Sequence, residues 1–244
     1  MTYLLIHGGG SSARFWDRLR PELDQPELAV NLPGRADRPA DLGTLTVDDE
    51  VASVLADVAA AELADPIVIV AHSSGGLVVP GVVAGLGPRV SHIVLNAASV
   101  PPEGGCGLDC MKPRHREGVE LARDLAAADG TVLTTMGPPA DPEAFRQTYG
   151  GQPLDDDTLA FVVDPERCVI DTINHYFQPV HWSSVPGDVG VTYILNEADR
   201  PIPAALQEEM IARLPRPPTV IRIDSGHVPP VTDPVGFAQL LQQL

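Results

Sequence analysis

Basic residues, cysteines and long apolar runs are all scarce in this chain of 244 residues. Its 16 Lys and Arg residues stand against 33 Asp and Glu residues, which gives a formal net charge of −17. Because so acidic a protein repels polyanions, we expect no nucleic-acid partner and no membrane-surface partner. No apolar run approaches the ~20 residues that a bilayer-spanning helix needs. We interpret the acidity as the feature that keeps an ordinary cytosolic protein soluble.

Only three cysteines are present, at positions 106, 110 and 168. An odd number in a chain of this size argues against a secreted disulfide framework and suits a reducing compartment. Cys106 and Cys110 lack the accompanying Cys and His residues of a zinc site, so we expect no metal. The first ten residues have neither the basic start nor the apolar length of a signal peptide, and a cytoplasmic protein is therefore expected.

Strand and helix signals alternate at both ends of the chain but not in the middle. The predicted strands span residues 3–6, 27–31, 67–71, 92–97, 191–196 and 219–223. The predicted helices span residues 46–64, 74–85 and 203–214, and a last helix begins at about residue 234. Such alternation predicts an α/β fold with a mostly parallel sheet and helices on both faces.

The middle of the chain, residues 100–188, is rich in Pro, Gly and Asp and shows only broken helical stretches, at 116–128 and 171–177. We interpret it as a helical cap inserted over one end of the sheet, on a core made of residues 1–99 and 189–244. Two local signals are more specific. Thr46 and Asp49 fit a capping box at a helix start, and Pro80 predicts a kink inside the helix at 74–85.

A buried strand ends at the segment Ala71-His72-Ser73-Ser74-Gly75. This small-x-Ser-x-small pattern is typical of a nucleophile elbow, where a strand turns sharply into a helix and exposes a serine hydroxyl. Small residues are needed there because the turn is tight and the serine backbone is strained. Ser73 is therefore the candidate nucleophile.

A serine needs a histidine to accept its proton and a carboxylate to orient that histidine. His227 follows the last predicted strand, at the same sheet edge as Ser73. Asp199 follows the preceding strand and is our choice for the acid; Glu197 is the second candidate because it lies closer to the strand end. The order Ser73, Asp199, His227 is the order of the α/β-hydrolase fold.

A glycine loop, Gly8-Gly9-Gly10, follows His7 at the end of the first strand. We expect the backbone N–H of Gly9, with that of Ser74, to form an oxyanion hole, although Gly8 or Gly10 could be the donor instead. No helix opens in register after the glycines and no Walker lysine is present, which argues against a phosphate site. His7 is expected to brace this loop.

Together these segments resemble the α/β-hydrolases. The matching motifs are residues 7–10, 71–76, 196–203 and 225–227, and with the segment 96–102 the chain is similar to the compact branch of plant methylesterases and hydroxynitrile lyases. Those lyases carry a threonine in the oxyanion loop and a lysine after the catalytic histidine, where this chain has Gly8 and Val228. The resemblance therefore implies ester, lactone or thioester hydrolysis through an acyl-enzyme, without cofactor or metal.

The predicted cap holds over half of the few aromatic residues, and an apolar lining would exclude water from the site. These residues are Phe145, Tyr149, Phe161, Tyr176, Phe177 and Trp182. Of them we expect Phe177 and Trp182 to bind substrate. Two other hypotheses stay open: the same triad could serve carbon–carbon bond hydrolysis, a lyase reaction or a cyclisation, or the protein could be a ligand receptor with slow turnover. The sequence also leaves a homodimer open.

Overall fold

Six parallel strands form the central sheet of the computed structural model, which describes residues 1–135, 141–149 and 154–244. Their order across the sheet is β2-β1-β3-β4-β7-β8. The strands are β1 (Thr2–Ile6), β2 (Glu27–Val30), β3 (Ile67–His72), β4 (Val90–Asn96), β7 (Gly190–Asn196) and β8 (Thr219–Ile223). All six predicted strands are present, with ends that differ from the prediction by at most two residues.

Strand β3 lies at the centre, between β1 and β4, and every one of its residues is buried. Its run of branched residues suits a strand covered on both faces. Ala71 pairs with Ile6 of β1 and with Leu95 of β4, so the three strands end at the same level. The loops that follow them therefore meet at one edge of the sheet, which is where open parallel sheets place their sites.

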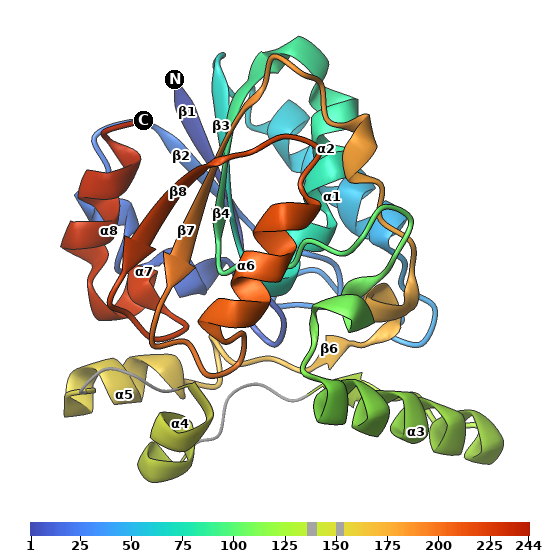
Figure 1. Cartoon of the computed structure of the whole chain (residues 1–244). Coiled ribbons are helices and arrows are strands. Elements are labelled where there is room, and N and C mark those ends of the chain that lie inside the picture. Colours follow the sequence, from blue (N-terminus) through green and yellow to red (C-terminus); the bar gives the residue numbers. More distant parts are fainter. Residues whose placement is uncertain (136–140, 150–153) are drawn as a thin grey trace.

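Two hydrophobic cores cover the two faces of the sheet, because successive side chains of a strand point to opposite sides. Along β1, Leu4 and Ile6 join one core, while Tyr3 and Leu5 join the other. Helices α1 (Val47–Ala60), α2 (Val79–Leu86) and α6 (Ala204–Arg213) contribute to the first core. Helix α8 (Pro234–Leu241) and the 3₁₀ helix Ala13–Trp16 contribute to the second. Figure 1 shows α1, α2 and α6 on one side of the sheet and α8 on the other.

The capping box predicted at the start of α1 is confirmed. The Thr46 hydroxyl accepts a hydrogen bond from the Asp49 N–H at 3.1 Å, and the Asp49 carboxylate accepts one from the Thr46 N–H at 3.0 Å. The kink expected at Pro80 is wrong. The segment forms a 3₁₀ helix, Ser73–Leu77, followed by α2, so Pro80 lies in the first turn of α2, where its missing N–H removes no intrahelical bond.

The segment between β4 and β7 crosses the carboxyl edge of the sheet. Its described elements are α3 (Pro113–Asp129), β5 (Thr134–Thr135), α4 (Pro142–Tyr149), α5 (Asp156–Val162), β6 (Asp171–Thr172) and the 3₁₀ helices Gly107–Cys110, Asn174–Phe177 and Trp182–Ser184. Outside this segment, a short helix α7 (Pro229–Thr232) lies between β8 and α8. In Figure 1, α3, α4 and α5 all lie beyond the end of the sheet opposite the two termini, with α4 and α5 at the lower left and α3 at the lower right. The helix expected at 116–128 begins earlier, at Pro113, and the stretch at 171–177 is a short strand followed by a 3₁₀ helix.

Cys106, Cys110 and Cys168 are all free thiols, in agreement with the predicted absence of a disulfide framework. Within the described ranges, every helix falls short of the length and hydropathy that crossing a bilayer requires.

Candidate active site

Ser73 lies directly after β3 in the sharp turn that the sequence predicts. Its φ is +52°, in the left-handed region that a residue with a side chain rarely adopts. Crowding explains the glycines that follow: a Cβ at Gly75 would lie 2.6 Å from the His7 carbonyl oxygen, and one at Gly76 would lie 2.4 Å from that of Ser99. The Ser73 carbonyl accepts a hydrogen bond from the Ser99 N–H at 2.8 Å, which ties the turn to the end of β4.

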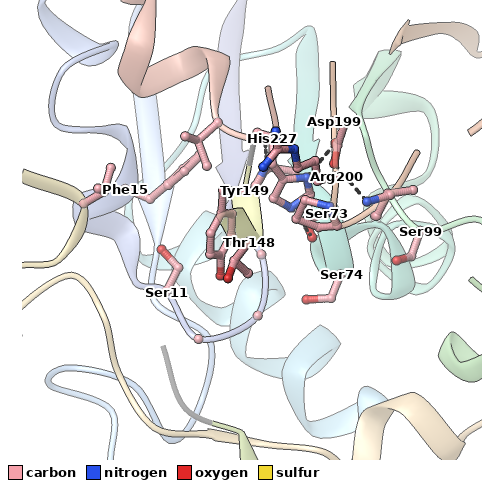
Figure 2. A pocket seen from close by; sticks show the side chains of 18 of the residues that line it. Ser11, Phe15, Ser73, Ser74, Ser99, Thr148, Tyr149, Asp199, Arg200 and His227 are labelled. Atoms are coloured by element: carbon pink, nitrogen blue, oxygen red, sulfur yellow. Dashed lines mark hydrogen bonds and ion pairs between the residues drawn. The ribbon is translucent and has the colours of Figure 1, made fainter. Parts of the chain in front are cut away.

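Ser73, His227 and Asp199 come together in one hydrogen-bonded chain at this edge (Figure 2). The His227 Nε2 atom lies 3.1 Å from the Ser73 Oγ, and its Nδ1 lies 2.7 Å from the Asp199 Oδ2. The other oxygen of Asp199 accepts the Ile202 N–H at 2.8 Å, which fixes the carboxylate. With Nδ1–H donated to the carboxylate, the lone pair of Nε2 faces the serine hydroxyl, which is the arrangement a general base requires.

Glu197, the second candidate for the acid, lies elsewhere. Its carboxylate is half exposed and pairs with Arg222 at 3.3 Å. The side chain of Asp199, by contrast, is fully buried against His227. The geometry therefore selects Asp199 as the partner of His227.

The glycine loop after β1 lies beside the serine turn. The Gly10 N–H donates to the Asp171 carboxylate at 3.0 Å, so it is already engaged. A Cβ at Gly9 would lie 3.1 Å from the Ser74 Oγ and 2.7 Å from the Tyr176 hydroxyl, which shows how closely this residue packs against the serine turn. Among the described residues, the N–H groups of Gly8 and Gly9 have no hydrogen-bond acceptor, in contrast to that of Gly10.

His7 braces the glycine loop, as expected. Its Nδ1–H donates to the Gly8 carbonyl at 2.8 Å, and its Nε2 accepts the Leu32 N–H at 3.3 Å. Burial, together with the positive charge of Arg35, lowers the pKa of His7 to about 3. The imidazole is therefore neutral at physiological pH. It is present in one tautomer, with the proton on Nδ1, and in that form it holds the loop in place.

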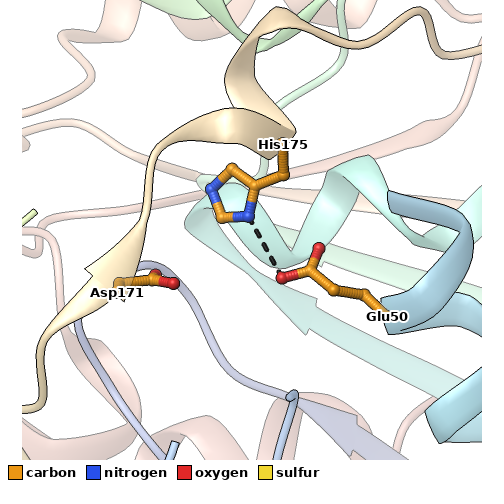
Figure 3. Close-up of side chains that lie close together, drawn as sticks. All are labelled: Glu50, Asp171 and His175. Carbon is orange, nitrogen blue, oxygen red and sulfur yellow. Dashed lines mark hydrogen bonds and ion pairs between the residues drawn. The ribbon is translucent and has the colours of Figure 1, made fainter. Parts of the chain in front are cut away.

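Four buried charged residues, which we call the charge cluster, support the loop from behind: Arg35, Glu50, Asp171 and His175. Arg35 pairs with Glu50 at 3.0 Å and also with Asp171. The His175 Nδ1 lies 3.1 Å from the Glu50 carboxylate. Figure 3 marks this contact with a dashed line. The four residues are not recognisable as a set in the sequence, because the fold brings them together from three separate segments.

The charges in this cluster stabilise one another. Burial alone would raise the pKa of Glu50, but the charges and hydrogen bonds of His175 and Arg35 outweigh it, and the pKa is lowered. Burial alone would lower the pKa of His175, but Glu50 and Asp171 outweigh it, and the pKa is raised. Both shifts favour the ionised forms, which is how a buried set of charges avoids the cost of an unpaired member.

The cluster also has the donor types of a metal site. Ligand atoms of Glu50, Asp171 and His175 lie within 4.8 Å of one another. Arg35, however, pairs with both carboxylates, so its guanidinium supplies positive charge at the place where a cation would bind. We therefore assign the cluster a structural role.

A cavity of about 1000 Å³ opens above Ser73. Five aromatic residues line it: Phe15, Phe145, Tyr149, Phe161 and Tyr176. Tyr149 stacks on Phe145 with ring centroids 4.6 Å apart, and its ring lies 5.8 Å from that of His227. Phe15 stacks on His72, whose ring N–H donates to the His227 carbonyl at 2.8 Å. The cavity wall next to the serine is thus largely aromatic.

The two aromatic residues that we expected to bind substrate do not line this cavity. The guanidinium of Arg123, a residue of α3, lies over the Phe177 ring at 4.3 Å from the ring centroid. Trp182 is 2% exposed and is part of the first hydrophobic core, where the chain returns towards β7. The prediction failed because the path of an irregular segment decides which rings face inward. Phe15 was missed, although it follows the glycine loop by only a few residues.

This fold and site define a class of protein, the α/β-hydrolases. The chain belongs to the alpha/beta hydrolase family, whose family model matches residues 3–240, and it is an enzyme of that family. No curated protein sequence shows significant similarity to it.

Several solved structures have the same fold at low sequence identity. One is an extracellular α/β-hydrolase from a Paenibacillus species, described as sharing structural and functional homology with tobacco salicylic acid binding protein 2. Its TM-score is 0.78 at 20% sequence identity, and the match covers 100% of this chain and 98% of the Paenibacillus chain. A pyrethroid hydrolase from Sphingobium faniae has a TM-score of 0.74 at 18% identity, with 100% and 96% covered. A methylesterase from Arabidopsis has a TM-score of 0.69 at 18% identity, with 100% and 98% covered. The predicted fold and the predicted resemblance are confirmed.

Proposed function

We propose that this protein hydrolyses carboxylic esters of small organic molecules through a Ser73–His227–Asp199 triad. The observation that carries the proposal is the hydrogen-bonded chain itself: 3.1 Å from serine to imidazole and 2.7 Å from imidazole to carboxylate, at the floor of a cavity. These are the contacts that activate a serine hydroxyl as a nucleophile.

In the first half of the reaction, the Ser73 Oγ attacks the ester carbonyl carbon while His227 Nε2 takes its proton. The carbonyl oxygen becomes an oxyanion, which the backbone N–H groups of Ser74 and Gly9 stabilise. His227 then gives the proton to the alcohol oxygen, the carbon–oxygen bond breaks, and the acyl group remains on Ser73. Asp199 stabilises the imidazolium that forms between these two transfers.

In the second half, His227 removes a proton from water, and the resulting hydroxide attacks the acyl carbon. The same N–H groups stabilise the second oxyanion, and the proton returns to Ser73 as the acid leaves. Every step uses groups of this chain and water. His72 takes no proton in this scheme, because burial and the neighbouring His227 lower its pKa well below the usual value.

The cavity supports a substrate with apolar parts. Aromatic rings cover the wall beside Ser73, and Val228 and Val231 add aliphatic surface. Such a lining excludes water from the acyl-enzyme and holds an acyl or alcohol group by burial. Among the similar structures, one is named a methylesterase and another a pyrethroid hydrolase, which supports a hydrolase and favours ester hydrolysis.

The site fits cyanohydrin cleavage less well. A Cβ at Gly8 would lie 2.8 Å from the Ser73 Cβ, so the threonine of the lyases would displace the nucleophile. Val228, in the place of their lysine, is buried and apolar. The loop therefore favours hydrolysis.

A series of 4-nitrophenyl esters with increasing acyl length tests the proposal. We expect hydrolysis by the wild type and a loss of at least ~10³-fold in kcat for Ser73→Ala, because the nucleophile is removed while the oxyanion donors remain. Ser74→Ala is the matched control, since Ser74 acts through its backbone. Equal rates for Ser73→Ala and the wild type would refute the mechanism. Tight binding of an ester without turnover would instead indicate a receptor.

A further inference from the structure

The charge of the cavity is opposite to the charge of the protein. Acidic residues outnumber Lys and Arg by 33 to 16 in the chain. Among the described residues that line the cavity, however, the only carboxylate is that of Asp199, which faces His227. Three permanent cations line the same cavity: Lys112, Arg167 and Arg200. A cleft lined by one sign of charge concentrates the opposite charge inside it.

These cations differ in how far other groups already neutralise them. Arg167 pairs with Asp164 and Asp17, and its guanidinium lies over the Phe161 ring at 4.0 Å. Arg200 donates to the Gln147 carbonyl at 3.2 Å, which keeps it at the cavity wall next to α4. The charge of Arg167 is therefore largely neutralised by these two carboxylates.

Lys112 is the only lysine of the whole chain, and it lines the cavity from the exposed start of α3. Its ammonium donates to the Arg200 carbonyl at 3.1 Å. In the part of the chain that the structure describes, no carboxylate lies within ion-pair distance of it. The Arg200 carbonyl holds the ammonium in place without neutralising its charge.

The start of α3 provides an independent observation. The N-terminal end of a helix has a partial positive charge, and acidic residues normally occupy the first turn. Helix α1 follows this rule with Asp48, Asp49 and Glu50. Helix α3 does the reverse: it has no acidic residue in its first turn, and Lys112 and His115 lie at its start. His115 lines the same cavity. A bound anion would compensate this local excess of positive charge.

We propose that the substrate carries a carboxylate, bound at the start of α3 by Lys112 with support from His115. This proposal rests on the hydrolase function proposed above and narrows its substrate class to half-esters of dicarboxylic acids or similar carboxylate-bearing esters. The apolar rings near Ser73 hold the chain between the two ends. With a net charge of −17, the surface as a whole repels anions, so a local site is required for this selectivity.

Paired substrates test the proposal. The mono-4-nitrophenyl esters of adipic and suberic acid carry a terminal carboxylate, and 4-nitrophenyl hexanoate and octanoate are their neutral counterparts of equal chain length. We expect the wild type to have the higher kcat/KM for the charged ester of each pair. Lys112→Gln should lower kcat/KM for the charged esters by about fivefold, mainly through KM, which corresponds to an exposed ion pair. For the neutral esters the change should be small.

Arg114→Gln is the matched control, because Arg114 is exposed on the same helix but does not line the cavity. It should leave both kinds of ester unaffected. About 0.5 M NaCl should reduce the preference of the wild type for the charged esters, since salt screens exposed charges.

The possible failures are distinguishable. If neutral esters are hydrolysed but the charged esters show no preference, or Lys112→Gln affects both kinds equally, the carboxylate site is wrong and the esterase proposal stands. If neither kind is hydrolysed and Ser73 does not react with a serine-directed reagent, the esterase proposal fails and the carboxylate site fails with it. Thermal denaturation of both variants establishes that they are folded.

Discussion

At the scale of single residues, the choice of acid is the most specific assignment in the site. Asp199 and Glu197 are two positions apart on the same loop, yet only Asp199 contacts His227, at 2.7 Å. Glu197 pairs with Arg222 at the surface. The two carboxylates therefore offer a comparison in which charge and loop are shared but burial and contact with His227 differ.

We expect Asp199→Asn to reduce kcat by about 10³- to 10⁴-fold, because an amide no longer holds the His227 tautomer or stabilises the imidazolium. Glu197→Gln should change kcat by less than about twofold, since an exposed ion pair contributes little. The measurement is steady-state hydrolysis of a 4-nitrophenyl ester by both variants. A large loss in Glu197→Gln with near-normal Asp199→Asn would reverse the assignment.

At the scale of elements, the oxyanion loop depends on contacts with β6 and the 3₁₀ helix that follows it. Asp171 of β6 accepts the Gly10 N–H, and the Tyr176 hydroxyl packs so close to Gly9 that a Cβ there would lie 2.7 Å from it. Residues far away in the sequence thus position the loop that is proposed to stabilise the oxyanion. Pre-positioned donors need no rearrangement when charge develops, which is why small shifts of this loop should be costly.

Gly9→Ala should lower kcat by about ten- to a hundredfold, because the added Cβ would lie 2.7 Å from the Tyr176 hydroxyl and must displace the loop. Adding Tyr176→Phe removes that oxygen, so the Gly9→Ala loss should be smaller in the Tyr176→Phe background, as a double-mutant cycle measures. Gly118→Ala is the control, since no atom lies within 4 Å of a Cβ there. Strictly additive effects would show that the contact does not position the loop.

The sequence predicts some elements well because their signals are local. The strand–serine–glycine turn at Ser73 and the capping box at Thr46 depend on neighbours in the sequence, and both are present in the structure. Asp199 and His227 were found from chain order and from the rule that parallel strands end at one edge. Phe177 and Trp182 were misplaced because no periodic pattern determines the path of the segment between β4 and β7.

At the scale of the whole molecule, the charge cluster joins distant segments of the chain. Arg35 comes from the loop after β2, Glu50 from α1, and Asp171 and His175 from the segment between β4 and β7. Sequence analysis does not reveal such a set, because its members are far apart in the chain and meet only in the folded structure. The cluster fixes the segment that bears Asp171, and with it Gly10, to the core.

The cluster should make stability depend on pH. The groups facing His175 are Glu50, Asp171 and Arg35, and the two carboxylates raise its pKa against burial. Because the folded pKa is above the unfolded value of about 6.5, the stability that His175 contributes is fully present below that pH and is lost as pH rises through the folded pKa.

His175→Asn should therefore lower the free energy of unfolding by about 2 kcal/mol near pH 6 and by less near pH 9. Denaturant unfolding at both pH values measures this difference. His181→Gln, at an exposed ion pair with Glu103, should lose little at either pH. A destabilisation by His175→Asn that grows with pH would contradict the assigned charges.

The central claim, that Ser73 is a nucleophile activated by His227, is tested most directly by covalent labelling. The protein is treated with a serine-directed fluorophosphonate, and the intact mass and the labelled peptide are then measured. We predict one adduct, on Ser73, in the wild type and in Ser74→Ala, much slower labelling in His227→Asn, and none in Ser73→Ala. An adduct on another residue, or labelling of His227→Asn at the wild-type rate, would contradict the account.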